Sequence, residues 1–140
     1  MMSKDYFRRI RELKSLIKSK EIQSASLRDL AVNINPNYSV MPKNPSKSAS
    51  PMEEVVCKAL DLESETNELK KRLISMEIEA IDLINEISDA NYQALLTRRY
   101  IRMENWEDIA RELYYSQSTV YRVHREAVAA FDAVLERHAI

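Results

Sequence analysis

The run of residues 52–88, which contains neither Gly nor Pro, most constrains how this chain can fold. Apolar side chains recur in it every seven residues, and a second set, with Thr66 as its polar member, recurs four positions later in each heptad. The two sets are Val55, Leu62, Leu69, Met76 and Leu83, and Ala59, Thr66, Leu73, Ala80 and Ile87. This period is typical of a coiled-coil helix. We therefore predict one long helix that serves oligomerisation, and a homo-oligomer with a dimer favoured.

Further apolar residues beside this seam predict a second neighbour for the long helix. Leu60, Ile74, Ile78, Ile81 and Ile84 widen the stripe beyond that of a two-stranded zipper. The helix carries ten acids against four cations, whereas the first 22 residues of the chain carry seven cations against three acids. Opposite charge makes the N-terminal segment a candidate partner, in the same chain or in a neighbouring one. The alternative for this basic stretch is contact with phosphates or with a polymerase.

The N-terminal segment, residues 1–34, is predicted to be helical, because its apolar residues follow helical spacing. These residues are Tyr6, Ile10, Leu13, Ile17, Leu27, Leu30, Ala31 and Ile34. All four prolines of the chain lie in the next window, residues 35–51. Proline blocks the continuation of a helix, so we predict an extended Pro/Ser-rich linker there.

Residues 105–131 have the pattern of two amphipathic helices joined by a short turn. Asn105 and Ser116 stand where N-caps are expected. The apolar residues of the first helix are Trp106, Ile109, Ala110 and Leu113, and those of the second are Val120, Val123, Ala127, Val128 and Phe131. This arrangement predicts a helix-turn-helix.

A preceding helix, capped by Ser88 or Asp89, would complete a three-helix module over residues 89–140. Its inward residues are Leu95, Leu96, Tyr100 and Ile101, and we expect Trp106 and Phe131 in the same core. The predicted fold class is all-α: an N-terminal helix and the long coiled-coil helix of residues 52–88, followed by this module.

The outward side of the last helix, near its N-terminus, carries the functional hypothesis. It presents Gln117, Ser118, Tyr121, Arg122 and Arg125, with two cations and no acid between the first and the last of them. Arg suits guanine, Gln suits adenine, and hydroxyl groups suit phosphate or base. We therefore predict that these side chains read the major groove of double-stranded DNA. The alternative is an ordinary solvated helix face.

A cluster of cations in the preceding helix is a second candidate for DNA contact. Arg98 and Arg102 are predicted to hold phosphates beside the groove. Alternatively they pair with acids of the following helix, and Arg99 belongs to the edge of the core.

The C-terminal third of the chain resembles region four of sigma-70-type factors. The residues that carry this resemblance are Leu95, Arg99, Tyr100, Ile109, Ala110, Ser116, Val120, Val123, Ala127 and Val128. The ArpU-like and RinA-like regulators of phages from Gram-positive bacteria share this module, and the layout of the whole chain is similar to theirs. The resemblance implies a phage-type transcriptional regulator in the bacterial cytoplasm that binds promoter DNA, with host RNA polymerase as a further partner.

One position departs from the family pattern. Region four has Gly in its turn, in a position that is commonly left-handed, whereas Tyr114 stands there in a chain that contains no Gly. A non-Gly residue in that conformation costs roughly 1–2 kcal/mol. Either the turn differs here, or packing holds Tyr114 in place.

Composition argues against an enzyme, a cofactor and a membrane anchor. Without Gly, phosphate loops and nucleophile elbows cannot take their usual form. Cys57 does not cluster with His124 or His138, and the carboxylates of Glu77, Glu79 and Asp82 spread around a helix, so we expect no metal. No run of 18 apolar residues is present, and we expect no membrane partner.

The charge of the module leaves two other functions open. Residues 89–140 hold seven cations and eight acids, whereas strong DNA binders are usually basic. A protein-binding module that docks on RNA polymerase is therefore one alternative. The other is a DNA packaging protein like the small terminase subunits, which also combine a helix-turn-helix with an oligomerising coil.

Overall fold

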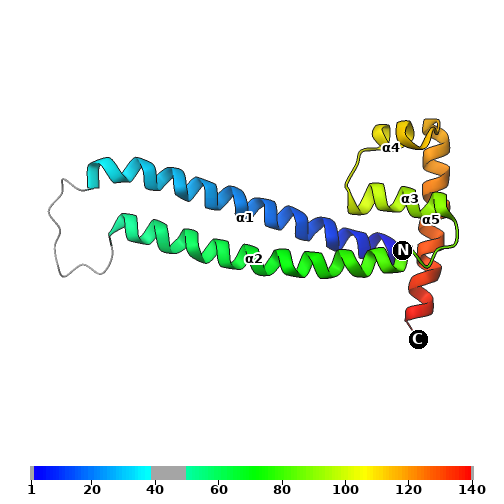
Figure 1. The fold of residues 1–140 in the computed structure, drawn as a ribbon, viewed down its shortest axis with the longest axis horizontal. Coiled ribbons are helices and arrows are strands. Elements are labelled where there is room, and N and C mark those ends of the chain that lie inside the picture. The colour runs from blue at the N-terminus through cyan, green and yellow to red at the C-terminus, as the bar shows by residue number, and fades with distance from the viewer. Residues whose placement is uncertain (1, 39–49, 140) are drawn as a thin grey trace. The chain divides into compact units, whose positions relative to one another are not determined.

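The computed structural model describes residues 2–38 and 50–139, with side chains for residues 2–33 and 50–139. Its elements are α1 (Met2–Tyr38), α2 (Pro51–Ile84), α3 (Ala90–Leu96), the π-helical segment η1 (Thr97–Ile101), α4 (Trp106–Leu113) and α5 (Gln117–His138), as Figure 1 shows. Within these described ranges every regular element is a helix, and the predicted all-α fold class is confirmed.

The first two helices are both longer at the proline-containing end than predicted. α1 continues through Pro36 to Tyr38, where the missing N–H of proline removes one backbone bond close to the helix end. α2 begins at Pro51, because the first N–H of a helix has no partner within the helix and proline, which lacks that N–H, is tolerated there. The Ser50 Oγ caps this end by accepting the Glu53 N–H at 3.0 Å. The rest of the predicted linker, residues 39–49, lies outside the described residues.

α2 ends at Ile84, four residues before the predicted end of the long helix. The chain tightens there, with the Glu86 N–H bonded to the Leu83 carbonyl at 3.1 Å. The Gln93 side chain donates to the Ile87 carbonyl at 2.5 Å, and the Asp89 carboxylate accepts the N–H of Asn91 at 2.8 Å as the N-cap of α3. Side chains at the start of the next helix thus bond backbone groups that this turn leaves without a helical partner. The apolar periodicity of residues 52–88 does not indicate such a turn.

The chain divides into two compact units. Unit 2, Leu13–Arg72, pairs the later part of α1 with the first part of α2. Leu13, Ile17, Ser24 and Thr66 are buried in it. Lys20 and Lys70 form ion pairs with Glu65 and Glu21 at 3.0 and 2.9 Å, and Arg28 pairs with Glu63. The basic segment and the acidic helix therefore meet within one chain.

Unit 1 combines the first turns of α1, to Glu12, with the chain from Leu73 onward. In it α5 contacts both α3 and α4 (Figure 1). Its buried core includes residues from all these segments: Phe7, Ile10, Ala80, Leu83, Ile84, Ile87, Leu95, Leu96, Ile109, Val123, Ala127, Phe131 and Val134. Phe131 is fully buried as predicted, but Trp106 is only partly buried, because it lies at the edge of this core.

The seam of α2 is covered inside the chain. In unit 1, Ala80 and Leu83 are buried, whereas the exposed fractions of Ile74, Ile78 and Ile81 are 56%, 56% and 39%. In unit 1 the end of the seam that was predicted to form an oligomer thus packs within the chain, as does Ile84 of the wider stripe, whereas Ile74, Ile78 and Ile81 face outward.

Candidate nucleic-acid interface

The turn between α4 and α5 is fixed by caps at both sides. The Asn105 Oδ1 accepts the Asp108 N–H at 2.8 Å, which satisfies a free amide in the first turn of α4. The Ser116 Oγ accepts the Thr119 N–H at 3.2 Å and does the same for α5. Both predicted N-caps are confirmed, and the orientation in which α5 leaves the turn follows from these bonds.

Tyr114 adopts the left-handed conformation, with φ 58° and ψ 41°. Packing does not hold it there, because the residue is 95% exposed. Backbone bonds hold it instead: the N–H of Tyr114 points to the carbonyls of Ala110 and Arg111, and the Tyr115 N–H bonds to Ala110 at 2.9 Å. The turn therefore has the geometry that suits Gly, and the expectation that packing holds Tyr114 is wrong.

α5 presents a polar strip to solvent next to this turn. Val120, Val123 and Ala127 anchor its opposite side, with exposed fractions of 1%, 6% and 0%. All five predicted reading residues are exposed: Gln117, Ser118, Tyr121, Arg122 and Arg125. At about 100° per residue, they lie within an arc of roughly 140°. We call these five residues the α5 strip.

Local contacts order the α5 strip. The Gln117 Nε2 donates to the Tyr121 hydroxyl at 3.3 Å. Arg122 pairs with Glu126 at 3.1 Å, and Glu126 also accepts the Tyr92 hydroxyl at 3.0 Å, a bond that raises the pKa of Tyr92. Among the described residues, Arg125 takes part in no ion pair. Arg125 is thus the cation of the strip whose charge is uncompensated.

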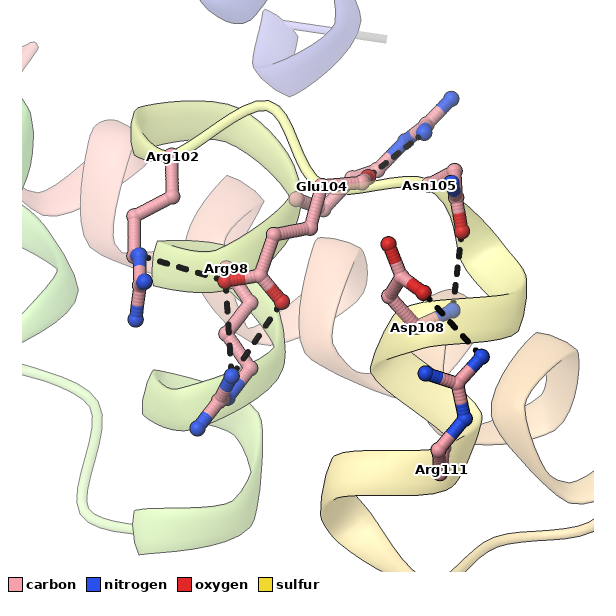
Figure 2. A network of polar contacts seen from close by, with 7 residues as sticks. Arg98, Arg102, Glu104, Asn105, Asp108 and Arg111 are labelled. Carbon is pink, nitrogen blue, oxygen red and sulfur yellow. Dashed lines mark hydrogen bonds and ion pairs between the residues drawn. The ribbon is translucent and has the colours of Figure 1, made fainter.

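Arg98 and Arg102 are both directed at Glu104, in the segment before α4 (Figure 2). The distances are 3.2 Å from the Arg98 Nη1 to Oε1 and 3.2 Å from the Arg102 Nε to Oε2. Of the two, Arg102 is the more exposed, with a side-chain exposure of 63% against 26%. The structure therefore places both arginines that were predicted to contact phosphate in an intramolecular ion-pair network. Of the two, only Arg102 has a side chain that is mostly exposed to solvent.

Beside the α5 strip lies a partly buried cluster of aromatic rings and one cation. The Arg99 guanidinium sits 4.4 Å from the centre of the Trp106 ring, and the Trp106 and His124 rings meet edge to face at 4.7 Å. The Tyr100 hydroxyl and the His124 Nε2 are 2.6 Å apart. Burial lowers the pKa of His124, and the charges of Arg99, Lys4 and Arg125 lower it further. Arg99 thus lies at the edge of the core, which was the alternative to a role in phosphate contact for this cluster of cations.

The first turns of α1 also reach this region, which the sequence analysis did not foresee. The Phe7 ring stacks on Tyr100 with centroids 4.1 Å apart. The Ser3 N–H donates to the Asp132 Oδ1 at 2.8 Å, and the Ser3 Oγ donates to the Val128 carbonyl at 3.2 Å. Phe7 stands in register with Ile10 on the buried side of α1, and this spacing was the available signal.

Residues 48–132, more than half of the chain, match the family described as "Protein of unknown function (DUF1492)". The chain belongs to this family. The matched range runs from just before α2 into α5, so it includes the α5 strip and excludes α1. No curated protein and no solved structure matches the chain.

Metal-binding groups and membrane-spanning helices are both absent from the part of the chain that the structure describes. There, no group of three or more His, Cys, Asp or Glu side chains is arranged to hold a metal ion. In the same residues, no helix has the length and apolar character needed to cross a membrane.

Proposed function

We propose that this protein is a sequence-specific regulator that binds double-stranded DNA and places the start of α5 in the major groove. The observation that carries the proposal is the α5 strip itself. Two capped helix starts and a tight turn fix the helix, Val120 and Val123 anchor it from behind, and polar side chains project from its first turns. This is the arrangement by which recognition helices present side chains to base edges.

The side chains of the strip fit different parts of a DNA duplex. Arg125 is exposed and uncompensated, so its guanidinium is available for guanine or for phosphate. Gln117 and Tyr121 already contact each other at 3.3 Å, and the amide can exchange that weak contact for an adenine edge. Arg122 would have to leave Glu126, and we assign it phosphate contact.

The role in transcription rests on the resemblance to sigma region four and to the ArpU-like and RinA-like phage regulators. Transcriptional regulation of phage or prophage promoters is the biological role that we propose. A homo-oligomer, with a dimer favoured, belongs to the same proposal, because two readers on one assembly gain avidity through effective concentration. The exposed stripe of Ile74, Ile78 and Ile81 on α2 supports this part, since the seam itself is covered within the chain.

Selection from a random duplex pool at several salt concentrations tests the proposal. We expect a short enriched motif, with two spaced half-sites if the protein is a dimer, and recovery that falls as salt rises. The Arg122→Ala and Arg125→Ala double variant should lose the enrichment. Arg137→Ala provides the matched control, because Arg137 lies on the same helix, is exposed and pairs with Glu86 at 3.6 Å far from the strip. No enrichment by the unaltered protein at low salt would refute DNA reading.

One observation favours a protein partner as the second candidate. Arg98, Arg102 and Arg122 are each compensated by a carboxylate, which reduces the charge available for phosphates. A module that docks on RNA polymerase needs less free charge than a DNA reader. Capture of purified RNA polymerase by the protein, retained in the Arg122→Ala and Arg125→Ala double variant and without any DNA enrichment, would select this alternative.

A further inference from the structure

The first turns of α1 are held firmly on unit 1. Ser3 bonds to Asp132 and to the Val128 carbonyl on α5. Burial acts to raise the pKa of Asp132, but the bonds that it accepts from Ser3 contribute to keeping this pKa below its usual value. Phe7 is 3% exposed and lies between Tyr100 and Phe131, with ring centroids 4.1 and 4.6 Å away. Side chains next to Phe7 on α1 are therefore placed reproducibly with respect to η1 and α5.

Lys4 and Arg11 are the cations next to Phe7. They lie three residues before and four residues after it, so they project on the same side of the helix. Both side chains are exposed, and in the described part of the chain neither joins an ion pair. Arg8 differs, because Asp5 and Glu12 compensate it at 2.8 and 3.7 Å. Lys4 and Arg11 thus offer uncompensated charge at a fixed position.

Two other cations, Arg99 and Arg125, directly adjoin Tyr100 and His124 in the sequence, and the Phe7 ring next to Lys4 and Arg11 stacks on Tyr100. Burial raises the pKa of Tyr100, whereas the charges of Arg99 and Arg11 act in the opposite direction. Burial lowers the pKa of His124, and the charges of Arg99, Lys4 and Arg125 lower it further. Three elements far apart in sequence therefore supply one group of cations, whose mutual repulsion an anion would relieve.

We infer that Lys4 and Arg11 form a phosphate clamp that extends the α5 strip, and that they hold the DNA backbone beside the groove that α5 enters. The inference rests on the proposed function. Arg125 connects the two surfaces, because it belongs to the α5 strip and lies one helical turn before Val128, whose carbonyl accepts the hydroxyl of Ser3, the neighbour of Lys4. The clamp offsets the near-neutral charge of residues 89–140 with cations from outside that module and outside the matched family range.

A phosphate clamp has a signature that base reading lacks. Each phosphate contact contributes about 0.9 to the slope of log affinity against log salt, whatever the DNA sequence. The Lys4→Ala and Arg11→Ala double variant should therefore bind more weakly to every duplex and lower the slope by about 1.8 per protomer. The motif selected from the random pool should stay the same, because no base contact is removed.

The full chain with Arg8→Ala and Arg9→Ala provides the control, since it removes the same charge from the same helix. Arg8 is already compensated, and Arg9 stands two residues from Phe7, on a different side of α1. We expect this variant to keep the slope of the unaltered protein, and circular dichroism should show that both variants are folded.

Two results would overturn the clamp while leaving DNA reading intact. One is an unchanged slope in the Lys4→Ala and Arg11→Ala variant, together with loss of binding in Arg125→Ala. The other is an equal loss of slope in the control pair, which would indicate general attraction by net charge. If the unaltered protein binds no duplex at low salt, the proposed function fails and the clamp fails with it.

Discussion

Replacing Tyr114 by Gly should stabilise unit 1. Tyr114 has φ 58° and ψ 41°, a conformation that costs a non-Gly residue about 1–2 kcal/mol. The side chain is 95% exposed, so its removal sacrifices little packing. Gly gives back about 0.5–1 kcal/mol through the greater freedom of the unfolded chain. The net gain is therefore about 0–1.5 kcal/mol, and its central value of about 0.75 kcal/mol corresponds to a rise in Tm of roughly 3–6 °C.

Urea unfolding monitored by tryptophan fluorescence measures this gain. Trp106 is the single tryptophan of the chain and lies in unit 1 next to the α4–α5 turn, so its signal reports the relevant unfolding. The midpoint should rise at a constant slope. Tyr114→Ala is the control, because it removes the same ring and keeps the Cβ that makes the conformation costly. A Gly variant no more stable than the Ala variant would refute the account of the turn.

Two further expectations concern the core of unit 1. Phe131→Ala should lower the free energy of unfolding by about 3–5 kcal/mol, because Phe131 is fully buried. Trp106→Ala should lower it clearly less, because Trp106 is only partly buried. Equal losses of the two variants in urea titrations would contradict the packing described. Folding lowers the pKa of His124 from its ordinary value of 6.5, so the unfolded chain binds more protons than the folded chain as the pH falls. The free energy of unfolding should therefore decrease from about pH 7.5 downward, through pH 6.5. His124→Gln should flatten this dependence in unfolding measurements between about pH 7.5 and 5.5, and an unchanged dependence would show that other groups cause it.

The local features of the C-terminal module could be predicted because they depend on residues close in sequence. Asn105, Ser116 and Asp89 act as N-caps through bonds to amides two or three positions ahead. The inward positions of α5 follow from helical spacing alone, and Val120, Val123 and Phe131 are buried as expected. Neither alternative for Tyr114 was right in full, because the residue is left-handed as Gly would be, yet backbone bonds hold it there and packing does not.

Pairing of Arg98 and Arg102 with nearby acids was the alternative prediction, but the partner is Glu104, which lies before α4 and not in the following helix. Arg98 and Arg102 share Glu104 because the π-helical turn of η1 and the following loop, where Met103 has φ 58°, bring that carboxylate back toward them. Helical spacing does not describe such a path. Arg98 and Arg102 are consequently weaker candidates for phosphate contact than Arg125, which takes part in no ion pair among the described residues.

By itself the sequence determined the presence of the long helices, the caps of α3, α4 and α5 and the polar side of α5, because each depends on contacts within about one helical turn. The end of α2 at Ile84 and the π-helical η1 did not follow from it. Only the tertiary structure decided which charges are available and which segments share a unit. The bond from Ser3 to Asp132 spans 129 positions, and the stacking of Phe7 on Tyr100 also joins distant segments. Such contacts depend on how several helices pack together, so the place of the first turns of α1 beside α5 is a property of the folded chain.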